Sequence, residues 1–154
     1  MKISELLDTE SILLDIEAAN KEALITRLVG ELSDVLGEER VAHALEGVLQ
    51  RERIMSTAVG KGIAIPHAKL DGMQSHHAVF ARLRTPVDFG AMDDEPVRLV
   101  FMLVGAHKNS GIHIKLLSKI SRLLNHDNFR HQLLRVTDAE SVIQLFQEEE
   151  QPVG

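Results

Sequence analysis

Apolar and polar residues alternate near the start of this chain and then change to a helical spacing. Ile12, Leu14 and Ile16 fall on one side of an extended segment, which is the pattern of a strand with one buried face. Asn20 then offers a cap for a helix that Gly37 ends, and apolar residues recur along it at every third or fourth position: Leu24, Leu28, Leu32 and Val35. We therefore expect one strand followed by one amphipathic helix.

A second helix is predicted from about Glu39 to Arg53. Its apolar stripe consists of Val41, Ala44, Leu45, Val48 and Leu49. From residue 57 to residue 106 the pattern becomes extended, with candidate strands at residues 63–65, 77–83 and 97–104. The stretch from Leu99 to Val104 is apolar without alternation, which predicts a central strand covered by helices on both faces.

The last third of the chain returns to helical spacing, with predicted helices over residues 113–124, 129–134 and 139–146. Helices before and after a strand-rich middle predict an α/β fold, a three-layer sandwich in which a mixed, mostly parallel β-sheet has helices on both faces. We expect a single domain over residues 1–154, with its core at about 3–146 and a frayed, acidic tail at 147–154. The pattern leaves the strand order open.

Composition restricts what such a domain does. The chain has 154 residues, of which 44% are hydrophobic, enough for one well-buried core. A formal charge of −6 and an aromatic content of 3% argue against a nucleic-acid binder and favour proteins or small molecules as partners. The absence of cysteine, of a signal peptide and of an apolar run of membrane-spanning length predicts a cytoplasmic protein that does not insert into the membrane.

Several common chemistries lack their sequence signatures. The chain has no phosphate-binding loop of the glycine-lysine-serine type, no nucleophile elbow and no histidine pair in a zinc-protease spacing. Gly60-Lys61-Gly62 matches only a fragment of a dinucleotide fingerprint, because the third glycine and the following helix are missing. The chemistry that remains to be explained lies in the histidines.

His67 is the histidine that the local sequence singles out. It ends the run Gly60-Lys61-Gly62-Ile63-Ala64-Ile65-Pro66-His67. Proline fixes its own φ and holds the residue before it in an extended conformation, so His67 has little backbone freedom and its imidazole is oriented before a partner arrives. His43 and His107 have no neighbour that distinguishes them. Ordinary solvated positions are expected for four of the eight histidines, namely His76, His77, His126 and His131.

His113 and Arg51 are the other two candidates, and each has two interpretations. His113 falls in the first turn of its helix after Ser110-Gly111, which can supply the cap, so it either lies beside a bound phosphate or packs at the stripe edge against Leu117. Arg51 ends the second helix, where its guanidinium suits phosphate and Ser56 and Thr57 add hydroxyl donors. The local pattern alone favours an exposed arginine at the helix end, paired with Glu52 or with another neighbour.

Taken together, these positions form a recognisable set. It consists of the run from Gly62 to His67, the upstream residues Arg51-Glu52-Arg53 and Ser56-Thr57, and the downstream segments Pro86-Val87-Asp88-Phe89 and Pro96-Val97-Arg98-Leu99. With this set the chain resembles, from about Ile3 to Phe146, the enzyme IIA domain of the bacterial phosphotransferase system, of the fructose, mannitol or nitrogen-regulatory type.

The resemblance implies a phosphotransferase that works as a phosphohistidine carrier without a metal or another cofactor. His67 would accept a phosphoryl group through Nε2 from the phosphohistidine of an HPr-type phosphocarrier protein. By family position, Arg51 would neutralise phosphate charge and His113 would hydrogen-bond the phosphoryl group, with Ser56 and Thr57 as further contacts. A neutral imidazole suits this role because it is a good nucleophile near neutral pH.

The chain differs from the family pattern at two positions, and the resemblance leaves three functions open. Ala68 stands where many relatives have glycine, and Gly105 where many have proline. The receiver of the phosphoryl group is either a regulatory target or a IIB component that serves sugar uptake, and the absence of fused HPr, IIB or IIC segments favours the regulatory, nitrogen-type branch. A non-catalytic module that senses phosphorylation is the third function, and the intact His67, Arg51 and His113 argue against it.

Overall fold

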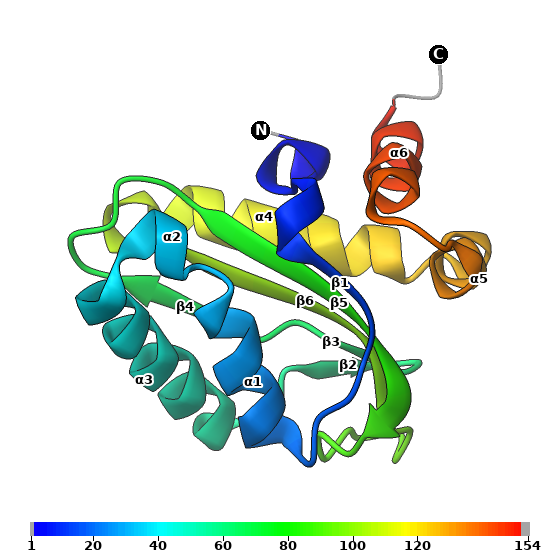
Figure 1. Cartoon of the computed structure of the whole chain (residues 1–154), viewed down its shortest axis with the longest axis horizontal. Coiled ribbons are helices and arrows are strands. Elements are labelled where there is room, and N and C mark those ends of the chain that lie inside the picture. Colours follow the sequence, from blue (N-terminus) through cyan, green and yellow to red (C-terminus); the bar gives the residue numbers. More distant parts are fainter. Residues whose placement is uncertain (1, 152–154) are drawn as a thin grey trace.

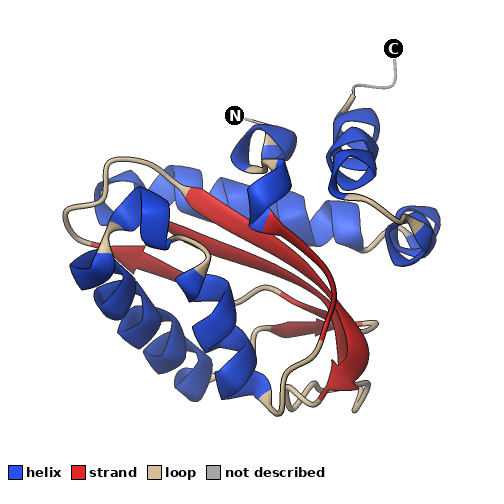
Figure 2. Cartoon of the chain, in the orientation of Figure 1, coloured by secondary structure: helices blue, strands red, loops and turns tan. Residues whose placement is uncertain are grey.

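A six-stranded sheet lies in the middle of the molecule, between two layers of helices (Figures 1 and 2). The computed structural model describes residues 2–151. Its strands follow the order β1-β5-β6-β3-β2, and β4 also pairs with β6. The strands are β1 (Ile12–Ile16), β2 (Ala58–Gly60), β3 (Ile63–Ala64), β4 (His67–Leu70), β5 (His77–Val87) and β6 (Val97–Ala106). The predicted three-layer α/β sandwich is confirmed.

The sheet is mixed, as predicted. Among the described residues β1–β5, β3–β6 and β4–β6 pair in parallel, while β5–β6 and β2–β3 pair antiparallel. The antiparallel β5–β6 ladder is the longest and sets Ala78 opposite Leu103 and Phe80 opposite Phe101. On the other side of β6, β3 and β4 follow one another along the same strand, so they behave as one interrupted strand, of which β3 also pairs with β2.

Each face of the sheet has its own helices. One face is covered by α1 (Lys21–Gly30), α2 (Ser33–Leu36) and α3 (Glu38–Ile54), and the other by α4 (Ser110–Leu124), α5 (Asp127–Arg135) and α6 (Ala139–Glu150) (Figure 1). Strand β6 alternates between the two cores: Val100 and Met102 pack on the first side, and Phe101 and Leu103 on the second. This explains why its sequence is apolar without alternation.

The single helix expected between Asn20 and Gly37 is two helices, so that prediction was wrong. Asn20 does cap the first one, because its Oδ1 accepts the Ala23 N–H at 2.8 Å. After Gly30 the chain tightens through backbone bonds to residues three positions earlier, such as Leu32 N–H to the Val29 carbonyl. The tighter turn keeps Leu32 buried but leaves Val35 62% exposed, so the apolar stripe does not continue.

The predicted frayed tail is also wrong for residues 147–150. Helix α6 continues to Glu150, whose carboxylate accepts the backbone N–H groups of Ile3 and Ser4 in the first turn (Ile3–Leu6) of 3₁₀-helix. These N–H groups have no partner within their own turn, so the carboxylate satisfies them and joins the two ends of the described chain. The part of the predicted tail at residues 152–154 lies outside the described residues.

Two short strands, β2 and β4, were not expected from the sequence. Each has four residues or fewer, and a hydrophobic period needs more positions than that to be recognised. The predicted strands at 63–65, 77–83 and 97–104 are all present, the last two with longer C-terminal ends. None of the helices between residues 2 and 151 has both the length and the apolar character needed to cross a membrane.

Candidate functional site

His67 begins β4, at the point where the edge of the sheet is interrupted. Strand β3 ends at Ala64, Ile65 and Pro66 follow, and the chain rejoins β6 with His67 opposite Leu103. Pro66 has no N–H, but its carbonyl accepts the Leu103 N–H at 3.0 Å, so the break does not release the chain from β6. The sequence predicts that His67 leaves a strand, whereas the structure shows it starting the next one.

One hydrogen bond fixes both the orientation and the tautomer of the His67 ring. The distance between Nδ1 and the Ile65 carbonyl oxygen is 2.8 Å. Because a carbonyl oxygen can only accept, Nδ1 carries the proton and donates it, which leaves the lone pair of the neutral ring on Nε2. The predicted aiming of the imidazole therefore has a structural cause, a bond to the residue just before the proline.

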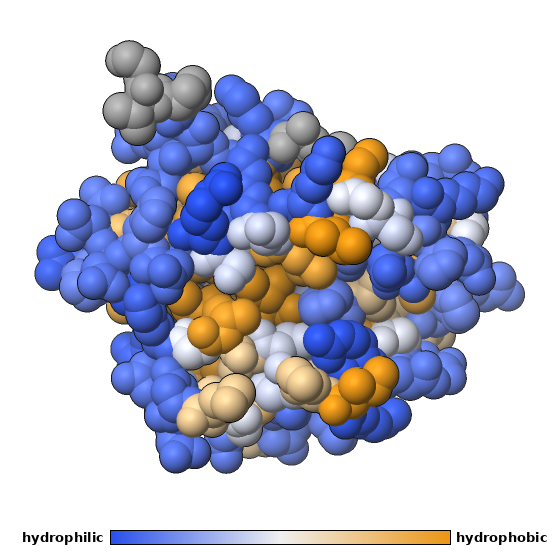
Figure 3. Space-filling model, turned by 180° about the vertical axis from the view of Figure 1, so that it is seen from behind, coloured by the Kyte–Doolittle hydropathy of each residue, from blue (hydrophilic) through white to orange (hydrophobic). Residues whose placement is uncertain are grey.

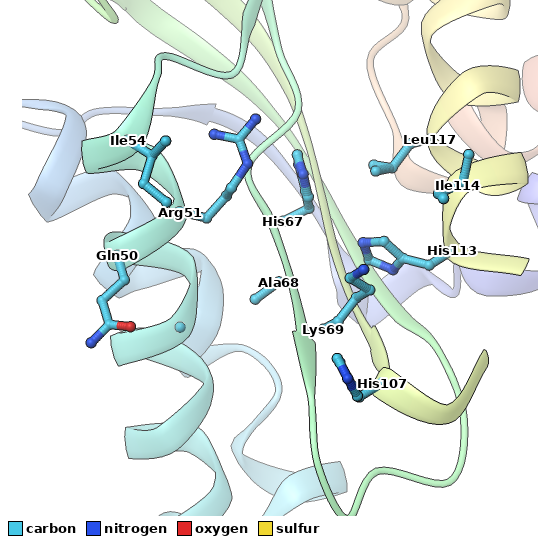
Figure 4. A pocket seen from close by; sticks show the side chains of 11 residues that line it. Gln50, Arg51, Ile54, His67, Ala68, Lys69, His107, His113, Ile114 and Leu117 are labelled. Carbon is cyan, nitrogen blue, oxygen red and sulfur yellow. The ribbon is translucent and has the colours of Figure 1, made fainter. Parts of the chain in front are cut away.

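Arg51 and His113 lie on either side of His67 in one pocket of about 550 Å³ (Figure 4). The pocket opens at the edge of the sheet, with α3 on one side and α4 on the other. The sequence thus predicted three residues from distant segments that the structure brings together.

Arg51 reaches this pocket from the last turn of α3. A close approach between α3 and β4 makes this possible, because a Cβ added to Gly47 would lie 2.9 Å from Leu70 Cδ2. The Arg51 Nη1 donates to the Met55 carbonyl at 2.8 Å, which caps the helix. The structure shows no ion pair between Arg51 and Glu52, which was the alternative drawn from the sequence. Figure 4 shows the guanidinium beside His67.

His113 comes from the first turn of α4 and is almost fully buried, with 1% of its surface exposed. Its ring centre lies 5.7 Å from that of His67. Among the described residues neither ring nitrogen has a hydrogen-bond partner. The expected cap by Ser110-Gly111 is wrong: Asn109 holds the cap position without a side-chain bond, and the Ser110 hydroxyl donates to the His107 carbonyl.

The electrostatics of the site favour uncharged imidazoles. Burial is the main cause that lowers the pKa of His67, and the Arg51 charge acts in the same direction, while the bond to the Ile65 carbonyl and the Glu52 carboxylate oppose it. Burial, the neighbouring histidines and Lys69 lower the pKa of His113 to about 4. Both rings are therefore neutral near pH 7, where His67 offers a free lone pair.

Ser56 and Thr57 line a hollow of about 390 Å³ that they share with Arg51 and His67. The Thr57 hydroxyl, however, donates to the Glu52 carboxylate at 2.8 Å, and the Thr57 N–H donates to the other oxygen at 2.7 Å. The Ser56 hydroxyl oxygen accepts the Ala58 N–H at 3.1 Å. These bonds hold the segment that follows Arg51 in a fixed conformation.

His76 is the residue of this region that the sequence misassigned. It was expected in solvent, but it is only 7% exposed and its ring centre lies 5.3 Å from that of His113. The Ser75-His76-His77 segment has the polarity of a loop, so nothing local indicates burial. His126 and His131, in contrast, are exposed as predicted.

Apolar side chains surround the opening of the pocket. Ile54 is 80% exposed, Met55 68% and Ile114 61%, and Ile54 and Ile114 line the pocket itself. Figure 3 shows hydrophobic side chains gathered in the middle of the molecular face that carries α4, within a hydrophilic surrounding. We call Ile54 and Ile114 the apolar rim.

Two proteins of similar sequence extend over nearly the same length as this chain. The nitrogen regulatory protein of Bradyrhizobium diazoefficiens is 36% identical over 142 residues, which cover 92% of each protein. The fructose-specific EIIA component of the phosphotransferase system of Haloferax volcanii is 36% identical over 140 residues, which cover 91% of each. In sequence identity, this regulatory protein and this sugar-specific protein are thus equally similar to the chain.

The similar solved structures also include both a nitrogen regulatory protein and a sugar-specific enzyme IIA. The nitrogen regulatory protein IIA-Ntr from Neisseria meningitidis has a TM-score of 0.87 and 32% identity, over 94% of this chain and 98% of that one. The mannitol enzyme IIA of Escherichia coli, in complex with phosphorylated enzyme IIB, has a TM-score of 0.77 and 26% identity, over 92% and 97%. The family described as phosphoenolpyruvate-dependent sugar phosphotransferase system, EIIA 2, matches residues 5–149, and this chain belongs to it.

Proposed function

We propose that this protein carries a phosphoryl group on Nε2 of His67, which it accepts from the phosphohistidine of an HPr-type phosphocarrier protein. The observation that carries the proposal is the bond between His67 Nδ1 and the Ile65 carbonyl, which leaves the lone pair on Nε2. This lone pair forms the new bond to phosphorus. The bond between phosphorus and the donor histidine breaks, and its electron pair stays on the donor nitrogen.

The other groups of the pocket stabilise the transferring phosphoryl group. Phosphoryl transfer has a loose transition state with charge on the equatorial oxygens, so fixed positive groups and donors supply most of the catalysis. Arg51 neutralises this negative charge. His113 donates a hydrogen bond from a helix N-terminus, and the positive end of the helix dipole lies there and also stabilises the phosphoryl group. The resemblance makes Ser56 and Thr57 further contacts. Of the two, we propose that Ser56 contacts the phosphoryl group through its hydroxyl, because the Thr57 hydroxyl is already bound to Glu52 and could serve only after leaving it.

The apolar rim supports a protein as the donor. Protein–protein contacts commonly consist of an apolar centre with polar residues around it. Ile54 and Ile114 provide such a centre at the opening of the His67 pocket, where the donor histidine has to enter. Replacing Ile114 with the uncharged Thr should slow phosphorylation by the phosphocarrier more than phosphorylation by a small donor such as phosphoramidate.

A labelling experiment tests the assignment. Incubation with labelled phosphoenolpyruvate, enzyme I and HPr should give an acid-labile, alkali-stable phosphoprotein, as expected of phosphohistidine. The variant His67→Gln should give none, while the control His131→Gln, at an exposed position on α5, should label like the parent. Label on the His67→Gln variant would disprove the assignment. Arg51→Lys then separates bidentate recognition from simple charge.

We further propose that the protein belongs to the nitrogen-type regulatory branch. The IIA-Ntr structure supports this, since its TM-score of 0.87 exceeds the 0.77 of mannitol IIA. The fructose-specific EIIA component with 36% identity supports the second candidate, delivery to a IIB component for sugar uptake. Transfer assays with purified IIB proteins of the same organism decide between them. Rapid loss of label from His67 to a IIB protein would contradict the regulatory function.

A further inference from the structure

Three histidine rings form a row in which His113 lies between His67 and His76. His67 and His113 line the pocket, and His76 packs behind His113. The ring centres are 5.7 Å apart for the first pair and 5.3 Å for the second, and the planes of His113 and His76 differ by 30°. The two inner rings are 1% and 7% exposed, so any charge they carry is confined within the protein.

The position of His76 depends on a glycine in β6. A Cβ built on Gly105 would lie 2.1 Å from Cδ2 and 2.2 Å from Nε2 of His76, closer than any real contact. The ring therefore lies directly against the backbone of β6, where only glycine leaves room for it. The glycine at this position therefore determines where the imidazole of His76 packs.

The inner rings have hydrogen-bonding capacity that the described residues do not use. Both nitrogens of His113 and Nε2 of His76 are buried without a partner. Unpaired buried polar atoms are unfavourable, so a protein retains them where a ligand completes them. A phosphoryl oxygen beside His67 would accept from one nitrogen of His113, which leaves the second nitrogen for His76, whose ring centre is 5.3 Å away.

The charges around the two rings are mainly positive. Lys69 of β4 and Arg51 of α3 face the row, with Glu52 as the opposing carboxylate, and the remaining groups are the imidazoles His67, His77 and His107. Burial lowers the pKa of His76, and burial with these neighbours lowers that of His113 to about 4. Without a ligand both inner rings are therefore neutral at pH 7.

We propose that His76 is a further positioning residue of the phosphoryl site, acting through His113 by sharing the proton that this pair binds when a phosphoryl group is on His67. The inference rests on the proposed function. The proton comes from solvent and returns to it when the phosphoryl group is handed on. With it, His113 donates one N–H to a phosphoryl oxygen and the other to His76, which accepts as a neutral imidazole.

The charge of the phosphoryl group is large enough for this proton uptake. It adds roughly −1.5 to −2 at neutral pH. One unit charge about 4 Å away, at an effective dielectric constant near 20, changes a pKa by roughly three. This brings the pKa of His113 from about 4 into the neutral range. His76 spreads the resulting positive charge over a second ring, which stabilises it in a place that water does not reach.

The test follows the histidine side chains by nitrogen NMR, over pH 4 to 9 before phosphorylation by phospho-HPr and over pH 6 to 9 afterwards, because the phosphohistidine is acid-labile. In the wild type, phosphorylation should raise the titration midpoint of His113 by at least about two pH units. In His76→Leu the titration midpoint of His113 should rise by less than about half of the wild-type increase. Gly105→Ala should have the same effect, because its Cβ displaces the ring. His77→Gln, one residue further along, is the matched control and should preserve the full increase.

A second measurement covers variants that fold poorly and separates this inference from the proposed function. In the unphosphorylated wild type, the signals of His76 and His113 should follow one shared, two-step titration, as expected of coupled groups. Independent titration of the two rings would overturn the proposal, and so would an undiminished midpoint increase in folded His76→Leu. If phospho-HPr leaves the wild type unlabelled, the proposed function fails, and the shared titration alone decides whether His76 and His113 form a proton-binding pair.

Discussion

Two buried polar clusters lie along β5, and they differ in how completely their hydrogen bonds are satisfied. Arg82, 7% exposed, donates to both carboxylate oxygens of Asp15 at 3.0 and 2.9 Å and to the carbonyls of Leu133 and Val136. His76, next to the start of the same strand, belongs to a histidine row in which three ring nitrogens of the described chain have no partner.

The difference separates a structural role from a functional one. The Arg82 cluster joins β1, β5 and the end of α5 through a two-point ion pair and two carbonyls, so it leaves little capacity for a ligand. The histidine row retains its capacity and lies beside a pocket. A buried polar cluster whose hydrogen-bonding atoms all have partners stabilises the fold. A cluster with unpaired hydrogen-bonding atoms is instead a place where a ligand can supply the missing partners.

The largest effect on stability is expected from Arg82→Met. The substitution leaves the carbonyls of Leu133 and Val136 without their donor, at about 2 kcal/mol each, so the free energy of unfolding should fall by about 4 kcal/mol; the exposed carboxylate of Asp15 returns to water and adds little. Urea denaturation at pH 7.5 measures this change. The control Arg84→Met, at an exposed position on the same strand, should change stability by less than about 0.5 kcal/mol. Equal effects of the two substitutions would remove the distinction drawn for Arg82.

The histidine row should make stability depend on pH. The pKa of His113 is about 4 in the folded protein against an ordinary value of 6.5, so between these values the unfolded chain binds a proton that the folded protein does not. The corresponding stability is complete above about pH 6.5 and is lost as pH falls to about 4, by about 3 kcal/mol. Urea denaturation of the wild type and His113→Leu at both ends of this range should show a smaller loss in the variant. Parallel curves would contradict a neutral, buried His113.

How much of the fold the sequence predicts depends on the range of the contacts. Strand β1, the Asn20 cap and helix α3 follow from local periodicity and local capping, and the structure has each of them. The burial of His76 depends on Gly105. The extension of helix α6 to Glu150 depends on the hydrogen bonds that the Glu150 carboxylate accepts from the N–H groups of Ile3 and Ser4. Those contacts join distant segments, which periodicity does not reveal.

The same division holds for the candidate site. The geometry of His67 is local, because Pro66 and the Ile65 carbonyl belong to its own segment, and the sequence predicted that its ring is aimed. The proximity of Arg51 and His113 to His67 came from the resemblance to a family and not from periodicity. The role of Arg82 could not be predicted from its own strand, because its hydrogen-bond partners belong to β1 and to the chain near the end of α5.

A medium effect is expected from Thr57→Val, which tests whether this hydroxyl serves the fold or the phosphate. The isosteric change removes the donor to Glu52, a carboxylate only 5% exposed, so stability should fall by about 2 kcal/mol. The rate of phosphorylation by phospho-HPr should change less than about twofold, because the hydroxyl already has a partner. A large loss of rate with unchanged stability would instead make Thr57 a phosphate contact. Ser56→Ala gives the matched measurement at the neighbouring hydroxyl.

The smallest effect has the opposite sign and is the sharpest test of the comparison. At pH 7.5, His113→Leu replaces two buried, unpaired nitrogens by apolar atoms of similar volume, so the free energy of unfolding should stay level or rise by up to about 1 kcal/mol. Phosphorylation of His67 should nevertheless slow by at least about tenfold, since the donor to the phosphoryl oxygens is gone. A substitution that strengthens the fold and weakens transfer means that His113 is retained for a ligand. If His113→Leu destabilised the protein as strongly as Arg82→Met, the histidine row would be a structural cluster like that of Arg82.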